Sequence, residues 1–168
     1  MNKENYVKLM NYWQEHRPFC KIMIATEKMA EIIVIISYAL LLVYSVYSDV
    51  GFALRSAVTS IIALYLCTLL RFVVNAKRPY QVYETLPAMH KDTLGQSFPS
   101  RHLTSVAVIA VSMLYTNIVI GCLFVALMLL MGTLRVLLGV HFVKDVTVGA
   151  VIGLAIGIVG IYIFPLII

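Results

Sequence analysis

The sequence predicts an all-α integral membrane protein, a helical bundle of about five transmembrane helices preceded by an N-terminal interfacial amphipathic helix. Of its 168 residues, 61% are hydrophobic and only 12% are charged, which is too little polar surface to cover a soluble globule. The chain contains several apolar runs close to the roughly 20 residues that a helix needs to cross the hydrocarbon core. It has no internal repeat, low-complexity tract or linker, so we expect a single membrane-embedded domain over residues 1–168.

Residues 1–28 differ in kind from the rest because charged and apolar side chains alternate in them. We expect an interfacial amphipathic helix that ends at Pro18. The segment lacks a charged start followed by an apolar core and a cleavage site, so it does not resemble a removable signal peptide. The apolar residues at helical spacing are Tyr6, Leu9, Met10 and Trp13.

The first two crossings are expected over about residues 29–47 and 52–74, with Glu31 at the polar end of the first. Asp49 and Gly51 indicate a tight turn between them.

Residues 103–134 carry no charge and are too long for one crossing at about 1.5 Å of rise per residue. A break at Thr116-Asn117 gives a third helix that starts near Ser100 and a fourth over about residues 118–138.

The fifth crossing is expected over about residues 146–164, where glycine recurs in a pattern that permits close contact between helices. These glycines are Gly149, Gly153, Gly157 and Gly160.

With five crossings, the N-terminal segment, the loop over about residues 75–98 and the turn between the last two helices share one side of the membrane. Ionisable groups at membrane depth are costly and usually serve a site. The net charge of +5 comes without a basic stripe, so we expect anionic lipid head groups rather than nucleic acid as the partner. The polar side chains on this side are Arg71, Lys77, Arg78, His90, Lys91, Ser100, Arg101, His102, Arg135, His141, Lys144 and Asp145.

Two pairs of polar residues have spacings that are typical of a functional site. Arg71 and Arg78 are seven residues apart, so on one continuous helix they point the same way, and Pro79 then ends that helix. His141 and Asp145 are four residues apart, so the carboxylate can hold one ring nitrogen and leave the other free. The alternative for Asp145 is a helix N-cap.

Two further features complete the pattern. Gly139 offers a bend that can bring Arg135 back towards His141. Ser100 can cap the third helix, whose free N–H groups form an anion site faced by His102. Arginines, a helix N-terminus and two histidines on one face suit phosphoryl transfer.

The chain contains three short motifs in this order: Arg71-x6-Arg78-Pro79, Pro99-Ser100-Arg101-His102 and Arg135-x5-His141-x3-Asp145. Together they resemble the signature motifs of the type 2 phosphatidic acid phosphatase superfamily, which also includes vanadium-dependent haloperoxidases. Three positions depart from the usual pattern: Arg71 replaces lysine, Arg101 replaces glycine, and Leu134 replaces serine, with Thr133 one place earlier.

The resemblance implies a mechanism. His141 attacks phosphorus to form a phosphohistidine, Asp145 orients and charge-stabilises it, and His102 protonates the leaving lipid oxygen and then activates water. No metal or other cofactor is implied. The implied phosphate ligands are Arg71, Arg78, Ser100, the N–H of Arg101, and Arg135.

The implied partners are the bilayer and a lipid phosphate; neither nucleic acid nor an obligatory protein partner is expected. Undecaprenyl pyrophosphate, phosphatidylglycerophosphate and phosphatidic acid all fit. The family's membrane members usually have six crossings, so the resemblance implies that this chain either lacks the first crossing or has the interfacial N-terminal helix in its place. The resemblance implies a bacterial plasma membrane and favours its outer face, whereas the basic residues before the first crossing favour a cytoplasmic N-terminus.

Two rival functions stay open. A lipid phosphotransferase uses the same phosphohistidine and passes the phosphoryl group to another lipid. A non-enzymatic metal-ion carrier needs a set of ligands such as His90, His102, His141 and Asp145, although neighbouring arginines repel a cation.

Overall fold

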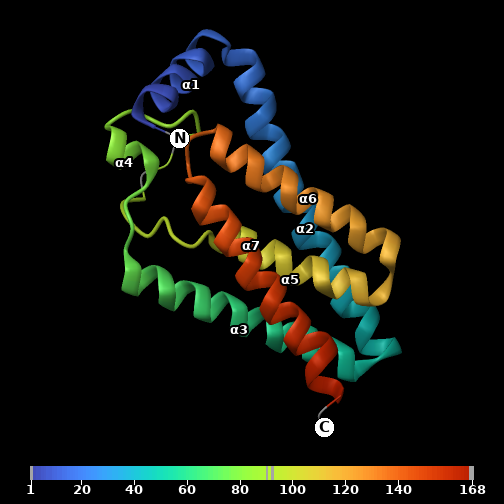
Figure 1. Cartoon of the computed structure of the whole chain (residues 1–168). Coiled ribbons are helices and arrows are strands. Elements are labelled where there is room, and N and C mark those ends of the chain that lie inside the picture. The colour runs from blue at the N-terminus through green and yellow to red at the C-terminus, as the bar shows by residue number, and fades with distance from the viewer. Residues whose placement is uncertain (1, 90, 92, 167–168) are drawn as a thin grey trace.

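The computed structural model describes residues 2–89, 91 and 93–166, and all regular structure in them is helical (Figure 1). His90, one of the residues of the carrier hypothesis, lies outside the described residues. The helices are α1 (Lys3–Glu15), α2 (Arg17–Ser48), α3 (Val50–Val74), α4 (Pro79–Tyr83), α5 (Arg101–Thr116), α6 (Ile118–Leu137) and α7 (Val143–Ile158), extended by π-helix η1 (Val159–Ile163) and 3-10 helix η2 (Phe164–Leu166).

The protein is a multi-pass membrane protein. Four helical segments are long and apolar enough to cross a bilayer, whereas α5, the third expected crossing, has 16 residues. At about 1.5 Å per residue, α5 spans roughly 24 Å, less than the roughly 30 Å hydrocarbon core. The four segments are Arg17–Ser48, Val50–Tyr83, which contains α3 and α4, Ile118–Leu137, and Val143–Ile163, which contains α7 and η1.

The helix α5 forms the centre of the bundle and is packed between α3, α6 and α7. Asn117 ends α5 and caps α6, where its side chain accepts from the N–H groups of Val119 and Ile120, so the predicted break is confirmed. The glycines of α7 allow close contact: a Cβ at Gly149 meets the backbone of Ser100, the N-cap of α5, and one at Gly153 meets the backbone of Thr104 in α5. These helices bury apolar side chains of α5 from Leu103 to Met113.

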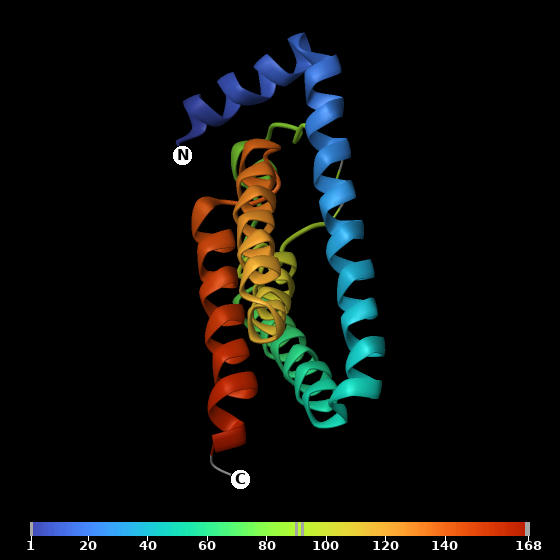
Figure 2. The same cartoon turned by 90° about the vertical axis from the view of Figure 1, so that its right-hand side faces the viewer.

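The N-terminal helix α1 is amphipathic, as predicted, but it ends at Glu15 and not at Pro18, which lies in the first turn of α2. Its apolar face packs on the protein itself. Tyr6, Met10 and Trp13 are buried against residues near the end of α6 and the turn that follows it. The Tyr6 hydroxyl donates to the Gly139 carbonyl at 3.0 Å, and Trp13 Nε1 donates to the Leu137 carbonyl at 2.9 Å. Figure 2 shows α1 lying across one end of the bundle.

The prediction of a continuous helix through Arg71 and Arg78 is wrong. The helix α3 ends at Val74 because Asn75 adopts a left-handed conformation, with φ of 40°. Arg78 is the residue before α4, and Pro79 begins that helix instead of ending the previous one. The two arginines therefore reach the same place from separate segments.

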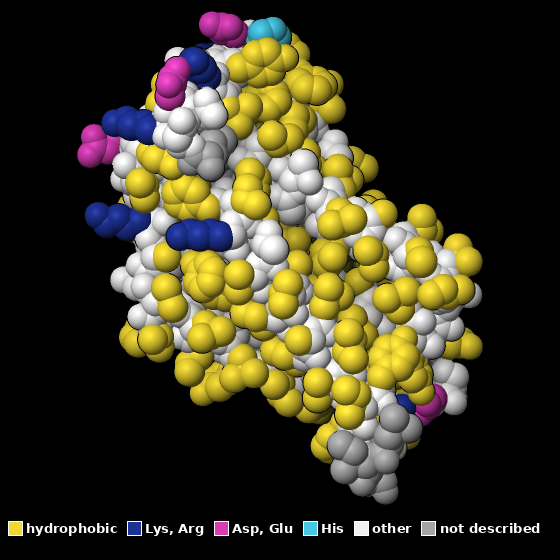
Figure 3. All heavy atoms as spheres, viewed as in Figure 1, with side chains coloured by type: hydrophobic (Ala, Val, Ile, Leu, Met, Phe, Trp, Pro, Cys, Tyr) yellow, Lys and Arg dark blue, Asp and Glu magenta, His cyan; other side chains and the backbone are white. Residues whose placement is uncertain are grey.

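The two ends of the bundle differ in polarity. In the space-filling view, charged side chains gather at the end that carries α1 and α4, while apolar side chains cover the middle (Figure 3). At the opposite end, Arg55 lies 3.9 Å from Asp49, at the turn between α2 and α3. The loop that follows α4 runs from the polar end down to the start of α5 (Figure 1).

Candidate active site

Predicted site residues from separate segments of the chain converge in one polar cavity of about 150 Å³. A space of this size suits a phosphate group rather than a whole lipid. The lining side chains include five cations and two imidazoles, so the cavity favours an anion. Its lining consists of Arg71, Arg78, Lys91, Thr93, Gln96, Arg101, His102, Arg135 and His141.

His141 and Asp145 meet, as their spacing predicts. His141 Nδ1 lies 3.5 Å from Asp145 Oδ2, and both side chains are fully or almost fully buried. Because His141 precedes α7, the contact forms across the N-terminus of that helix and not along one helical face. With Nδ1 facing the carboxylate, Nε2 is the ring nitrogen that remains for chemistry.

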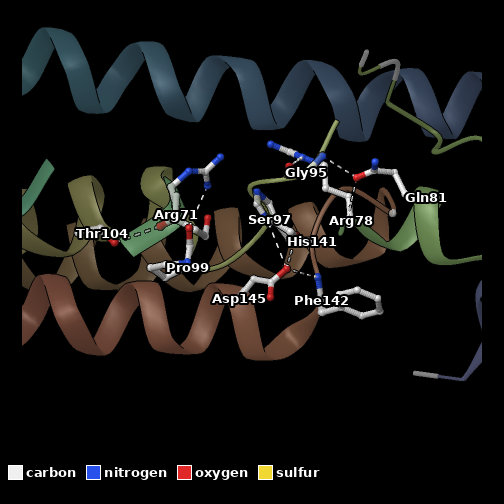
Figure 4. A network of polar contacts seen from close by, with 12 residues as sticks. Arg71, Arg78, Gln81, Gly95, Ser97, Pro99, Thr104, His141, Phe142 and Asp145 are labelled. Atoms are coloured by element: carbon white, nitrogen blue, oxygen red, sulfur yellow. Dashed lines mark hydrogen bonds and ion pairs between the residues drawn. The ribbon is translucent and has the colours of Figure 1, made fainter. Parts of the chain in front are cut away.

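The carboxylate of Asp145 has further partners. Ser97 Oγ donates to Asp145 Oδ2 at 2.5 Å, and the backbone N–H of Phe142 donates to the same oxygen at 3.0 Å (Figure 4). The N-cap alternative is wrong, since the N-cap of α7 is Phe142 and Asp145 lies in the first turn. Its carboxylate nevertheless satisfies a free N–H group of the helix start while it holds His141.

The turn that carries His141 depends on Gly139. This residue has φ of +77°, and a Cβ there comes within 3.0 Å of Tyr6 and Met10 of α1. The predicted bend is therefore present, and the backbone N–H of His141 bonds to the Arg135 carbonyl at 3.3 Å. It brings Arg135 and His141 to the same cavity.

Three of the four arginines of the motifs, Arg71, Arg78 and Arg135, are buried. Arg71 Nη1 donates to the Pro99 carbonyl at 2.9 Å, and Arg78 Nε donates to the Gly95 carbonyl at 3.2 Å. Figure 4 shows both side chains held beside the segment that leads into α5. These bonds fix the guanidinium groups at the cavity and leave other N–H donors for an anion.

Ser100 occupies the N-cap position of α5, but its side chain makes no capping hydrogen bond. Its Oγ is buried, with no partner among the described residues, and Ser100 does not belong to the described cavity lining. Arg101, in the place of the usual glycine, is exposed and lines both the polar cavity and a neighbouring groove.

That groove has a volume of about 220 Å³ and shares Arg101 and His102 with the polar cavity. The rest of its lining is mostly apolar and comes from α2, α3, α5 and α6. The residues are Glu31, Val34, Ile35, Leu64, Arg101, His102, Ser105, Val106, Ile109 and Met131.

Sequence reasoning missed two carboxylates of α2. Glu27 is buried and forms an ion pair with Arg135 Nη2. Glu31 Oε2 lies 3.6 Å from the same nitrogen, and Glu31 Oε1 lies 3.3 Å from His102 Nε2. Their spacing of one helical turn was a usable signal, since two acidic residues inside an apolar span need partners.

Ser97 was also missed as a site residue. It lies outside the described cavity lining, behind His141, and acts on Asp145 rather than facing an anion. Its place immediately before the second motif was the available signal, but a serine in a loop has many structural uses.

Burial lowers the pKa of His141, and the nearby charges of Arg78 and Arg135 act in the same direction. The hydrogen bond to Asp145 opposes the shift without reversing it. The free protein therefore holds His141 as a neutral imidazole, which is the form that can attack phosphorus.

A sequence profile described as the PAP2 superfamily matches residues 52–167, which is more than half of the chain. The chain belongs to the PAP2 superfamily. It is also 33% identical over 104 residues to the undecaprenyl-diphosphatase BcrC of Bacillus subtilis (strain 168), which covers 62% of this chain and 53% of that protein. The match thus spans about half the length of this curated relative.

The fold of this PAP2 chain is similar to two crystal structures. For Aquifex aeolicus LpxE, the TM-score is 0.73 at 22% identity over 95% of this chain and 93% of that one. For the first transmembrane PAP2 type phosphatidylglycerolphosphate phosphatase from Bacillus subtilis, the TM-score is 0.68 at 22% identity over 89% and 78%. At this identity the similarity establishes a common fold.

Proposed function

We propose that this PAP2 protein removes phosphate from a membrane lipid phosphate or pyrophosphate, without a metal, through a phosphohistidine intermediate. The observation that carries the proposal is the convergence of three buried arginines and two histidines in one cavity of about 150 Å³. The positive side chains of the cavity can neutralise the charge on the equatorial oxygens of a phosphoryl group during its transfer.

In the first step, Nε2 of His141 attacks phosphorus and the bond from phosphorus to the lipid-side oxygen breaks. His102 donates a proton to that oxygen, and Asp145 stabilises the positive charge that forms on His141. In the second step, water attacks phosphorus, His102 accepts its proton, and the phosphorus–nitrogen bond breaks to release inorganic phosphate. Arg71, Arg78, Arg135 and the N-terminus of α5 at Ser100 and Arg101 hold the phosphoryl oxygens, although Ser100 Oγ must turn towards the cavity to contribute.

A lipid substrate is supported by the groove beside the cavity. Because the two spaces share Arg101 and His102, one lipid molecule can place its phosphate in the cavity and its apolar chain in the groove. Undecaprenyl pyrophosphate, phosphatidylglycerophosphate and phosphatidic acid all have this form. The similarity to an undecaprenyl-diphosphatase makes undecaprenyl pyrophosphate the first substrate to test.

The test is phosphate release by detergent-purified protein in EDTA from these three lipids, beside His141→Ala. We expect release from at least one lipid and a loss of more than about 10⁴-fold in the variant, because the nucleophile is removed. No release from any of the three by folded wild-type protein contradicts the proposal.

A phosphotransferase is distinguished from a phosphatase by adding a second, unphosphorylated lipid and measuring its phosphorylated form. Transfer that exceeds phosphate release favours the phosphotransferase.

The metal-carrier alternative requires a set of ligands for the ion. Among the described residues, no group of three His, Cys, Asp or Glu side chains lies close enough to hold a metal ion.

We further propose that the protein resides in a bacterial plasma membrane with its site at the outer face. A cysteine at the exposed Thr93, in an otherwise cysteine-free chain, tests the face in intact cells. Labelling by a membrane-impermeant maleimide is expected; labelling only after the cells are permeabilised places the site in the cytoplasm.

A further inference from the structure

The helix α2 contributes two carboxylates to the site, although none of the three motifs lies on it. Glu27 and Glu31 are one turn apart and turn the same face towards α5 and α6. Between and beyond them, α2 exposes large apolar side chains, as expected of a helix that faces lipid. A carboxylate in such a helix is costly unless it has partners or a function.

The two carboxylates have different partners. Glu27 is 2% exposed and pairs with Arg135, so it balances the charge of that guanidinium and fixes its position. Glu31 is 3.6 Å from Arg135 but closer, at 3.3 Å, to Nε2 of His102. Since Glu27 already holds Arg135, the function of Glu31 is to be found at His102.

The contact of Glu31 matches the one that Asp145 makes with His141. In each pair a carboxylate faces one nitrogen of a catalytic imidazole, which fixes the tautomer and the rotation of the ring. With Nε2 of His102 directed at Glu31, Nδ1 is the nitrogen that can donate a proton to a substrate oxygen. The site thus contains two histidine–carboxylate pairs, one from the motifs and one completed by α2.

We propose that Glu31 is a positioning residue for the proton donor His102, and that it matters most when the leaving group is strongly basic. The proposal rests on the phosphatase function proposed above. A lipid alkoxide is a poor leaving group and needs a proton as the phosphorus–oxygen bond breaks, whereas a nitrophenolate leaves without one. The contribution of Glu31 should therefore depend on the leaving group.

The first experiment compares Glu31→Leu and Glu31→Gln with the wild type on dioctanoyl phosphatidic acid and on p-nitrophenyl phosphate. Leucine suits a position whose neighbours include Val34, Ile35 and Leu64. We expect kcat on the lipid monoester to fall about 10- to 100-fold in Glu31→Leu and less in Glu31→Gln. This loss is a fraction of the rate enhancement of about 10²- to 10⁴-fold that general acid catalysis usually provides. On p-nitrophenyl phosphate we expect less than about a threefold change.

Two further variants serve as controls for this experiment. Glu15→Gln, an exposed carboxylate of α1, should change neither rate. In a His102→Ala background, Glu31→Leu should cause no further loss on the lipid, because the two residues act through one proton. Equal losses on both substrates overturn the proposal in favour of a structural role. A lower KM on both substrates also overturns it, and identifies Glu31 as a competitor of phosphate for Arg135.

A second measurement does not depend on turnover. The ¹⁵N chemical shifts of His102 report which ring nitrogen carries the proton. The wild type should show the Nε2–H form, Glu31→Leu a mixture of tautomers, and Glu15→Gln the wild-type pattern. If the wild type releases no phosphate from any substrate, the phosphatase function fails; an unchanged tautomer in Glu31→Leu overturns the positioning proposal on its own.

Discussion

The two histidines of the cavity are held in different ways. The side chain of His141 is 2% exposed and lies in a network with Asp145, Ser97 and the backbone N–H of Phe142. The side chain of His102 is 32% exposed, and its ion-pair partner is Glu31 from the peripheral helix α2. The proposed nucleophile is thus fixed before substrate arrives, whereas the proposed acid is half-exposed and lines both the polar cavity and the apolar groove.

This difference suggests a division of functions. A nucleophile benefits from being held rigidly in a dry, preorganised place. A proton donor must serve first the lipid oxygen and then water, so a half-open position beside the groove suits it. Substitutions around the buried His141 should therefore lower the rate on every substrate. The effect of substitutions around the half-exposed His102 should depend on the leaving group.

Among the residues that hold the two histidines, the largest effect is expected from Asp145→Asn, which keeps the volume of the side chain but removes the charge that faces His141. We expect kcat to fall about 10³-fold on both a lipid monoester and p-nitrophenyl phosphate, with KM changed less than about threefold. Phosphate release under steady-state conditions measures both constants.

Ser97→Ala provides the graded comparison for this variant. It removes one hydrogen bond to the carboxylate and leaves the charge, so a loss of about tenfold is expected, again on both substrates. A loss in Asp145→Asn no larger than in Ser97→Ala contradicts the importance of the charge.

The second prediction concerns pH and stability. Burial lowers the pKa of His141 in the folded protein, so the unfolded chain binds a proton below about pH 6.5 while the folded chain does not. The unfolded state therefore binds more protons, and stability falls as pH falls, by at most about 1.4 kcal/mol per pH unit for this group.

The measurement is the thermal midpoint in detergent between pH 7.5 and pH 5. The wild type should lose more stability over this range than His141→Ala, in which the group is absent. Parallel curves for the two proteins contradict a buried neutral His141.

The smallest effect is expected from Tyr6→Phe, which tests whether α1 supports the turn that carries His141. Burial raises the pKa of Tyr6, so its hydroxyl stays neutral and donates to the Gly139 carbonyl. Removing it should cost about 1 kcal/mol of stability and lower kcat by a few-fold. Tyr47→Phe, at a position 88% exposed, is the control and should change neither the midpoint nor kcat.

The fold class and most of the proposed site could be predicted from the sequence. Apolar run lengths predict the crossings, because a bilayer leaves few alternatives to a helix of about 20 apolar residues. Asn117 marks the break between α5 and α6, since its short polar side chain caps a helix. Arg71, Arg135 and His141 could be predicted as site residues because their motifs keep fixed spacings.

Which side chains support that site depends on the tertiary structure. Glu27 and Glu31 lie more than 100 residues before Arg135 along the chain, and no local spacing connects them. Likewise, α1 packs against the turn at Gly139, and α3 ends before Arg78, because burial and backbone conformation overrode the helical pattern of the sequence. Local periodicity specifies which residues share a helix, but the contacts between helices depend on how they pack.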